Sequence, residues 1–241
     1  MPTVERAERL IRCFVNADEP FVPSRYGSHE PLRSTFDASD LIFPARMLSE
    51  RPRTLLLQRV RPRYDAFLTW MIDRDRPWLW NIDFAAAWLQ PKLCGPLRLT
   101  EFLVAVCTEF PPVFAGCATS GDRSLKHTVR RPGEHIEGMI LNPGEGLPGI
   151  YWLTFFGPDL VAFFGRKRLL ALDVHRIFDR GDSGVGILLQ ESPIEGTPEL
   201  RRERESAVVA ALGAEYFFDL ANAASAKPRL RMPIPRATDH T

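Results

Sequence analysis

The amino-acid sequence predicts an α+β fold, with a single domain built on one mixed, largely antiparallel sheet and helices packed on it. Three observations point to this class. Apolar residues recur at helical spacing in some segments, while other apolar segments have the length of strands. The 21 prolines are spread along the chain, which indicates many loops and short elements. A length of 241 residues, 45% of them hydrophobic, is ample for a buried core.

The N-terminal region, residues 1–45, is predicted to hold one helix followed by a loop region. Apolar residues between Val4 and Phe14 recur at helical spacing, which indicates a short amphipathic helix. Charged residues interrupt this segment, so we expect no secretory signal peptide. Residues 16–43 contain three prolines and one glycine and are predicted to form turns.

The middle of the chain is predicted to form two strands, a helix and a third strand. The aromatic and apolar segments 64–73 and 78–88 are separated by the polar sequence D-R-D-R-P, which indicates two strands joined by a turn. Segment 99–110 has its apolar residues on one side of a helix, and 113–118 has the length of a short strand. Residues 120–148 are rich in Gly, Pro and charge, so we expect a long connection across the surface.

The aromatic and apolar run GIYWLTFF at 149–156 predicts the central strand. The pair Gly157-Pro158 ends this strand, and the proline favours the start of a helix over 159–164. We expect residues 150–156 to lie buried near the centre of the sheet.

The C-terminal part is predicted to contain a hairpin, a helix and a last strand. The segments 174–178 and 185–190 flank D-R-G-D-S-G, which favours a hairpin. A helix is predicted over 197–212, because Thr197 can cap its N-terminus and Gly213 ends it. Residues 215–218 are predicted to form a short strand before an extended tail at 221–241. Segments 64–118 and 174–220 thus share the order strand, turn, strand, helix, strand, which suggests a duplicated ββαβ unit.

Composition bounds the function and the compartment. The net charge is +1, so we expect neither nucleic acid nor a membrane as the main partner. No apolar stretch approaches the length of a bilayer span. The four cysteines contain no C-x-x-C pair, so we expect free thiols and a reducing cytoplasm.

Two glycine-rich segments match motifs of cofactor or catalytic sites. GEGLPG at 144–149 matches G-x-G-x-x-G, but a dinucleotide site needs a strand before the motif and a helix after it. GDSG at 181–184 is similar to the loop around a serine-protease nucleophile, yet a Gly/Asp hairpin turn explains it. We therefore expect no bound cofactor and no catalytic residue.

Two further segments leave other function classes open. Residues His127, Glu134, His135 and Glu137 could hold a metal, which keeps a hydrolase or metal-dependent enzyme with a site in the 120–148 loop as an alternative. The segment 51–63 holds five arginines, so a scaffold or nucleic-acid-binding module that uses them is a second alternative.

Three segments together resemble a known family. These are PSRYGSHEPLRSTFD at 23–37, GLPGIYWLTFFGPDLVAFFGRKRLL at 146–170 and LGAEYFFDL at 212–220. They resemble the immunity protein 52 family of bacterial polymorphic-toxin systems, and the central block is also similar to the related type VI immunity family.

The resemblance implies a non-catalytic protein of the cytoplasm or periplasm that binds and neutralises one cognate toxin. Of these two compartments we expect the cytoplasm, because the cysteines are predicted to be free thiols. Because loops on a rigid scaffold carry binding functions, we expect partner contacts in the first resembling segment and in the 120–148 connection. The candidate partner-binding residues are Arg25, Tyr26, His29, Glu30, Arg33, Arg123, Lys126, Arg130 and Arg131.

Overall fold

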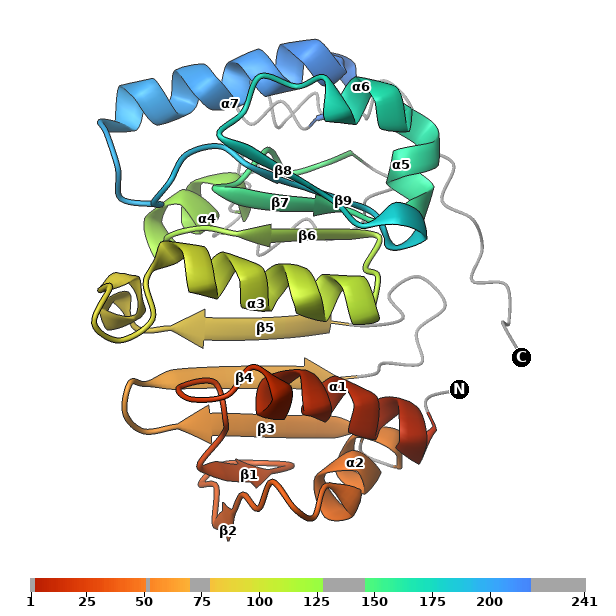
Figure 1. Cartoon of the computed structure of the whole chain (residues 1–241), viewed down its shortest axis with the longest axis vertical. Helices are drawn as coiled ribbons and strands as arrows, with labels where there is room; N and C mark the ends of the chain where they lie inside the picture. Colours follow the sequence, from red (N-terminus) through yellow and green to blue (C-terminus); the bar gives the residue numbers. More distant parts are fainter. Residues whose placement is uncertain (1–2, 51–52, 70–78, 128–145, 218–241) are drawn as a thin grey trace, which may run out of the picture. The chain divides into compact units, whose positions relative to one another are not determined.

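The chain forms two compact units, each with its own antiparallel sheet (Figure 1). A computed structural model describes residues 3–50, 53–69, 79–127 and 146–217. Unit 1 is Met1–Glu109 and unit 2 is Phe110–Thr241. The α+β class is confirmed, but the prediction of one mixed sheet is wrong, because the strands divide between a five-stranded and a four-stranded sheet. That the chain acts as a single immunity-type domain stays a prediction.

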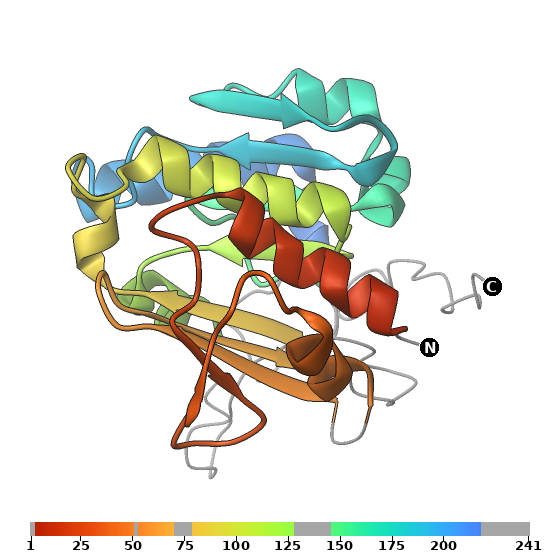
Figure 2. The same ribbon diagram turned by 60° about the horizontal axis from the view of Figure 1, so that its bottom comes forward.

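Unit 1 combines a five-stranded sheet with three α-helices and one 3-10 helix among its described residues. Its elements are α1 (Val4–Asn16), β1 (Arg25–Gly27), β2 (Ser34–Thr35), α2 (Ile42–Ser49), β3 (Thr54–Arg59), β4 (Tyr64–Thr69), β5 (Leu79–Phe84), η1 (Ala86–Leu89) and α3 (Pro96–Glu109). The strand order is β2-β1-β3-β4-β5, and all pairs are antiparallel. Figure 2 shows α1 and α3 on the same face of this sheet.

An aromatic cluster holds the helices of unit 1 to the sheet. The buried ring of Tyr64 on β4 lies 6.2 Å from that of Phe14 on α1 and 5.7 Å from that of Trp88 on η1, between ring centroids. Phe14 also meets Phe102 of α3 edge to face at 5.2 Å. The Tyr64 hydroxyl donates a hydrogen bond of 2.6 Å to the carbonyl of Phe21, so the buried phenol is satisfied.

Unit 2 contains a four-stranded sheet and the remaining described helices. Its elements are β6 (Phe114–Cys117), α4 (Ser120–His127), β7 (Leu153–Phe156), α5 (Pro158–Phe164), α6 (Arg166–Leu170), β8 (Arg176–Asp179), η3 (Gly181–Ser183), β9 (Val185–Leu188), α7 (Pro198–Leu212) and η4 (Ala214–Tyr216). The strand order is β6-β7-β9-β8, again antiparallel throughout.

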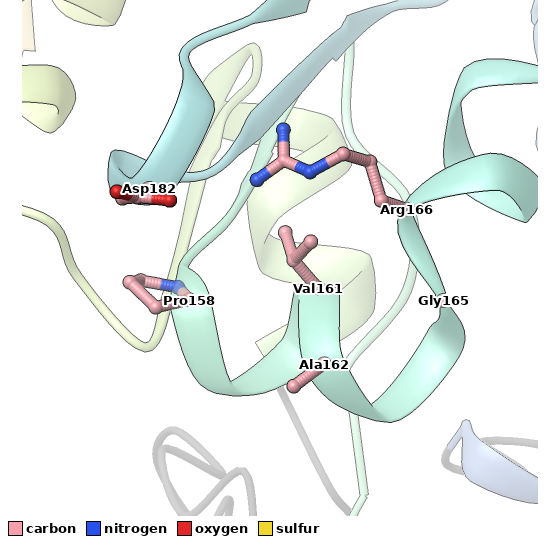
Figure 3. Close-up of a pocket in the computed structure, with 6 residues that line it drawn as sticks. All are labelled: Pro158, Val161, Ala162, Gly165, Arg166 and Asp182. Carbon is pink, nitrogen blue, oxygen red and sulfur yellow. The ribbon is translucent and has the colours of Figure 1, made fainter.

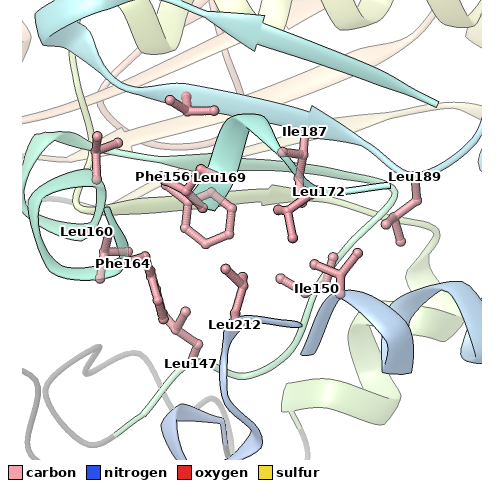
Figure 4. Close-up of a cluster of buried hydrophobic side chains, with 13 residues drawn as sticks. Leu147, Ile150, Phe156, Leu160, Phe164, Leu169, Leu172, Ile187, Leu189 and Leu212 are labelled. Carbon is pink, nitrogen blue, oxygen red and sulfur yellow. The ribbon is translucent and has the colours of Figure 1, made fainter. Parts of the chain in front are cut away.

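The predicted central run is the interior of unit 2. All residues of 149–157 are buried, and β7 pairs with β6 on one side and with β9 on the other. Phe156 of β7 belongs to a cluster with Ile187 of β9, Phe164 of α5 and Leu212 of α7 (Figure 4). The predicted strand is confirmed over Leu153–Phe156, while residues 149–152 are buried but lie outside it. The stop at Gly157-Pro158 and the helix after it are confirmed.

Several other predicted elements are confirmed with small shifts of their ends. The helices predicted at 4–14 and 99–110 are α1 and α3, and the hairpin at 174–190 is formed by β8 and β9. The helix predicted at 197–212 is α7, whose first turn is capped by the Thr197 hydroxyl accepting from the Leu200 amide at 3.3 Å.

The elements that differ depend on contacts between distant segments. The loop region within 1–45 also holds β1, which pairs with β3, and β2, which pairs with β1. Residues 120–127 of the predicted connection are helix α4, and the predicted strand at 215–218 is the 3-10 helix η4 with one bridge from Phe217 to Leu147. Residues 128–145 and the tail 221–241 lie outside the described residues.

The suggested duplication is wrong. In the first proposed copy, β4 and β5 belong to the sheet of unit 1, whereas β6 pairs with β7 in unit 2. In the second copy, η4 follows α7 where a strand was expected. No helix among the described residues has the length and apolar character needed to cross a membrane.

Trp152 gives a test of the packing in unit 2. Its side chain is 5% exposed, and its indole NH donates 2.9 Å to the carbonyl of Gln190. Trp152→Ala should lower the free energy of unfolding by roughly 3–5 kcal/mol, because it leaves a large cavity and an unpaired carbonyl. Urea unfolding measures this change, with Trp152→Phe as the milder control. An unchanged midpoint for the alanine variant would contradict this account of the core.

Candidate protein-binding site

The first group of predicted partner-binding residues lies on β1 and on the connection between β1 and β2, which together we call the ribbon. Arg25 pairs in register with Thr35 of β2 and Gln58 of β3, so the ribbon continues the sheet of unit 1. The side chains of Arg25, His29, Glu30 and Arg33 are exposed. Among the described residues, no ion pair joins Glu30 to Arg33.

Tyr26 differs from the other predicted residues of the ribbon. Its side chain is half-buried, and its ring meets the Phe36 ring edge to face at 6.2 Å between centroids. Successive strand residues point to opposite faces, so Tyr26 takes the face opposite to Arg25 and serves packing.

Buried side chains fix the segment that leads from this ribbon to α2. Leu32, Phe36 and Leu41 are 8%, 8% and 4% exposed, while most residues between them are exposed. The Phe36 amide also donates 3.1 Å to the carbonyl of Ser24. Residues 25–43, which we call the exposed strip, thus lie on the surface of unit 1, and from Leu32 onward a buried side chain recurs every four or five residues.

The strip ends in two exposed apolar side chains at the start of α2. Leu41, Pro44, Ala45 and Leu48 are buried and have the spacing of one helix face. Ile42 and Phe43 fall on the other side and are 51% and 60% exposed. Sequence reasoning missed this pair, although the spacing 41, 44, 45, 48 was the signal that could have found it.

Two carboxylates precede the apolar pair. Oδ1 of Asp37 accepts from the Ser39 hydroxyl at 2.7 Å and from the Ser39 amide at 2.8 Å, and these bonds lower the pKa of Asp37. Oδ1 of Asp40 accepts from the Ile42 amide at 3.1 Å. The strip is therefore basic on the ribbon and acidic beside α2.

Lys126, predicted as a surface contact, is buried in unit 2. Its side chain reaches three oxygens, with Nζ 2.9 Å from Asp122 Oδ1, 2.9 Å from Glu205 Oε2 and 2.6 Å from the carbonyl of Ile150. It also lies 4.9 Å from the centre of the Tyr151 ring. The prediction for Lys126 is wrong because its charge is used inside the unit, where it ties α4 to α7.

The segment before β7 depends on this ionic cluster. Glu205 Oε1 accepts from the Ile150 amide at 3.2 Å, so one carboxylate holds both Lys126 and the main chain. A Cβ atom on Gly149 would lie 2.8 Å from the same Oε1. The last glycine of the GEGLPG motif therefore serves close packing, and the motif leads into β7 and not into a helix.

The other predicted residues of 120–148 are only partly described. Arg123 on α4 is half-buried. Arg130 and Arg131 lie outside the described residues, as do Glu134, His135 and Glu137, which were considered as an alternative metal site although no metal is expected. Among the residues that the structure does describe, no three His, Cys, Asp or Glu side chains gather in a way that could hold a metal ion.

The GDSG segment borders a surface pocket of about 460 Å³ in unit 2 (Figure 3). Arg166 lines the pocket together with Val161 and Asp182. The Arg166 guanidinium pairs with Asp179 and donates to the carbonyl of Gly181. It thereby braces the β8–β9 turn, which agrees with the interpretation of GDSG as a hairpin turn.

The arginine-rich segment 51–63 is divided by the β3–β4 hairpin. Arg53 precedes β3, whereas Arg59 and Arg63 lie at the other end of this strand, roughly 20 Å away at about 3.3 Å per residue. Arg59 pairs with Glu19 and Arg63 pairs with Asp65 at 2.8 Å. The described arginines of this segment do not form one continuous basic surface.

The four cysteines are half-buried free thiols. Burial raises the pKa of Cys13 and of Cys94 to about 11, and that of Cys117 to about 12. These three thiols are therefore protonated and weakly nucleophilic at neutral pH.

Comparison of the chain with known protein families, curated proteins and solved structures finds no match.

Removing the buried cation tests the role of the Lys126 cluster. Lys126→Met should lower the free energy of unfolding by roughly 2–4 kcal/mol, because it strands two carboxylates and the carbonyl of Ile150. The control is Arg202→Met, which breaks the exposed pair with Glu199 and should cost less than about 1 kcal/mol. Equal losses in urea unfolding would contradict a structural role for Lys126.

The same cluster predicts a pH effect. Burial raises the pKa of Glu205, and the nearby Lys126 only partly offsets this. Because the folded state holds the Glu205 proton more tightly than the unfolded state, stability from this group is present below its ordinary pKa of 4.5 and is lost as pH rises through the raised value. The stability of wild type relative to Glu205→Gln should therefore fall as pH rises from about 4 to 7. A stability of wild type relative to Glu205→Gln that rises over this pH range would contradict the raised pKa of Glu205.

Proposed function

We propose that the chain is a toxin-neutralising immunity protein, which binds and inhibits a cognate bacterial toxin and catalyses no reaction. The family resemblance of residues 23–37, 146–170 and 212–220 supports this proposal. The observation that carries it is the exposed strip. The first resembling segment presents Arg25 on β1, and His29, Glu30 and Arg33 in the connection to β2, to solvent. Pairing of β1 with β3 and the buried side chains of Leu32 and Phe36 hold this segment on unit 1.

The chemistry of the strip suits a protein partner. Protein interfaces combine a core of large apolar anchors with a rim of polar and charged groups. The strip offers both, because its charged ribbon runs into the apolar pair Ile42 and Phe43. An interface of standard size, about 1,600 Å² in total, is enough for nanomolar binding when its anchors are good.

The other resembling segments support a scaffold role. Residues 146–170 contain β7, α5 and α6, and residues 212–217 contain η4. Their apolar side chains make up most of the core of unit 2. In this proposal the protein acts in the cytoplasm of the toxin-producing cell, with the toxin as its partner and without a cofactor.

Charge reversal on the ribbon tests the proposal. The chain is co-expressed with the toxin encoded by the neighbouring gene, and protection and affinity are measured. Arg25→Glu with Arg33→Glu should weaken binding by roughly tenfold or more, because wrongly placed charges at an interface are costly. The control is Lys167→Glu, an exposed cation on α6.

The proposal fails if the wild-type chain neither binds the toxin nor protects the cell. If the wild type protects and the ribbon variant, still folded by circular dichroism, protects equally well, the ribbon is not part of the interface.

A further inference from the structure

We propose that Ile42 and Phe43 are the apolar anchor of the interface, and that they enter an apolar pocket with a basic rim on the toxin. This inference rests on the proposed function and deepens it, because it names the binding residues and the chemistry of the surface that receives them.

The fold of unit 1 leaves more than half of each of these two side chains uncovered. The buried face of α2 is complete without them, since Leu41, Pro44 and Leu48 are buried at helical spacing. Among the described residues, Ile42 and Phe43 are the only neighbours in sequence that are both large, apolar and more than half exposed. Adjacent exposed apolar groups of this size mark binding surfaces more often than single ones do.

The charges around the pair favour a basic partner. The Asp40 carboxylate is held beside Ile42 by the 3.1 Å bond from the Ile42 amide. The hydrogen bonds from Ser39 lower the pKa of Asp37, which favours its ionised form. Arg46, one turn into α2, lies 3.9 Å from the carboxylate of Glu50, which balances it. The carboxylates therefore make the surroundings of Ile42 and Phe43 negative. Lys or Arg residues around the toxin's apolar pocket would complement this charge.

The pair is also held ready for binding. Leu41 fixes the main chain directly before it, and the helix fixes the chain after it. A partner that buries Phe43 has only side-chain rotations to restrict, and such preorganisation preserves affinity.

The experiment measures binding of the full chain to the toxin encoded by the neighbouring gene, inactivated in its active site, by calorimetry. Phe43→Ser and Ile42→Ser should each weaken binding by at least about 30-fold, the change expected for an interface hot spot. Ile194→Ser and Leu97→Ser are matched controls, because these side chains are 65% and 53% exposed on other surfaces. The controls should bind like the wild type.

A second pair of variants tests the charge. Asp37→Asn and Asp40→Asn keep the Oδ1 acceptors that hold the turn and remove the two negative charges. The double variant should associate more slowly and lose most of the salt dependence of the association rate. If the salt dependence of the association rate is unchanged, the proposed basic rim on the toxin is wrong.

The outcomes separate this inference from the proposed function. If the wild type binds the toxin and the Ile42 and Phe43 variants bind equally well, the anchor is refuted and the proposed function stands. If the wild type does not bind the toxin, the proposed function fails. If the chain alone forms a dimer in ultracentrifugation that Phe43→Ser dissociates, a second copy occupies the pair and the inference is wrong.

Discussion

Three buried side chains, Leu32, Phe36 and Leu41, keep the exposed strip on the surface of unit 1. Each contributes about 1.5–3 kcal/mol by leaving water, while the residues between them need no packing of their own. Among the described residues, this division leaves Arg33 and other exposed positions without structural hydrogen bonds, such as Glu30, free to vary without loss of the fold. The strip can therefore be rigid enough to bind and still be open to changes of specificity, which a buried strand such as β7 cannot be.

Two cations that were both predicted as surface contacts differ in their environment, because Lys126 is buried and Arg25 is exposed. Lys126 and Arg25 are both cations in segments rich in polar residues, and their local sequences predict surface positions for both. Lys126 is buried because Glu205 on α7 and the carbonyl of Ile150, both distant in sequence, supply oxygens that offset its desolvation. The aliphatic part of the Lys126 side chain can lie among apolar groups. The Tyr151 ring lies next to the Lys126 ammonium group. No local sequence pattern indicates partners so distant in the chain, so the sequence could not show that Lys126 is buried while Arg25 is exposed.

What the sequence predicted correctly depends on local physics. The cap at Thr197, the stop at Gly157-Pro158 and the spacing of α1 need only neighbours in the chain. What it missed depends on pairing between distant segments. Strand β3 was missed because its buried residues Leu55 and Leu57 stand among arginines. The short strand β1 pairs with β3, and β2 pairs in turn with β1, so both depend on partners distant from their own sequence. The assignment of strands to two sheets is likewise a property of partners and not of segments.

For the same reason, only half of the candidate site could be predicted from the sequence. The ribbon residues were visible through a family resemblance, whereas Ile42 and Phe43 become noticeable only when the other face of α2 is known to be buried. The two halves together have a consequence for specificity. A strip that is basic at Arg25 and Arg33 and acidic at Asp37 and Asp40 distinguishes the two directions in which a partner can lie along it. In the proposed complex a reversed partner would meet like charges, which costs several kcal/mol. The apolar pair would then set the affinity, while the charges would set the orientation of the partner.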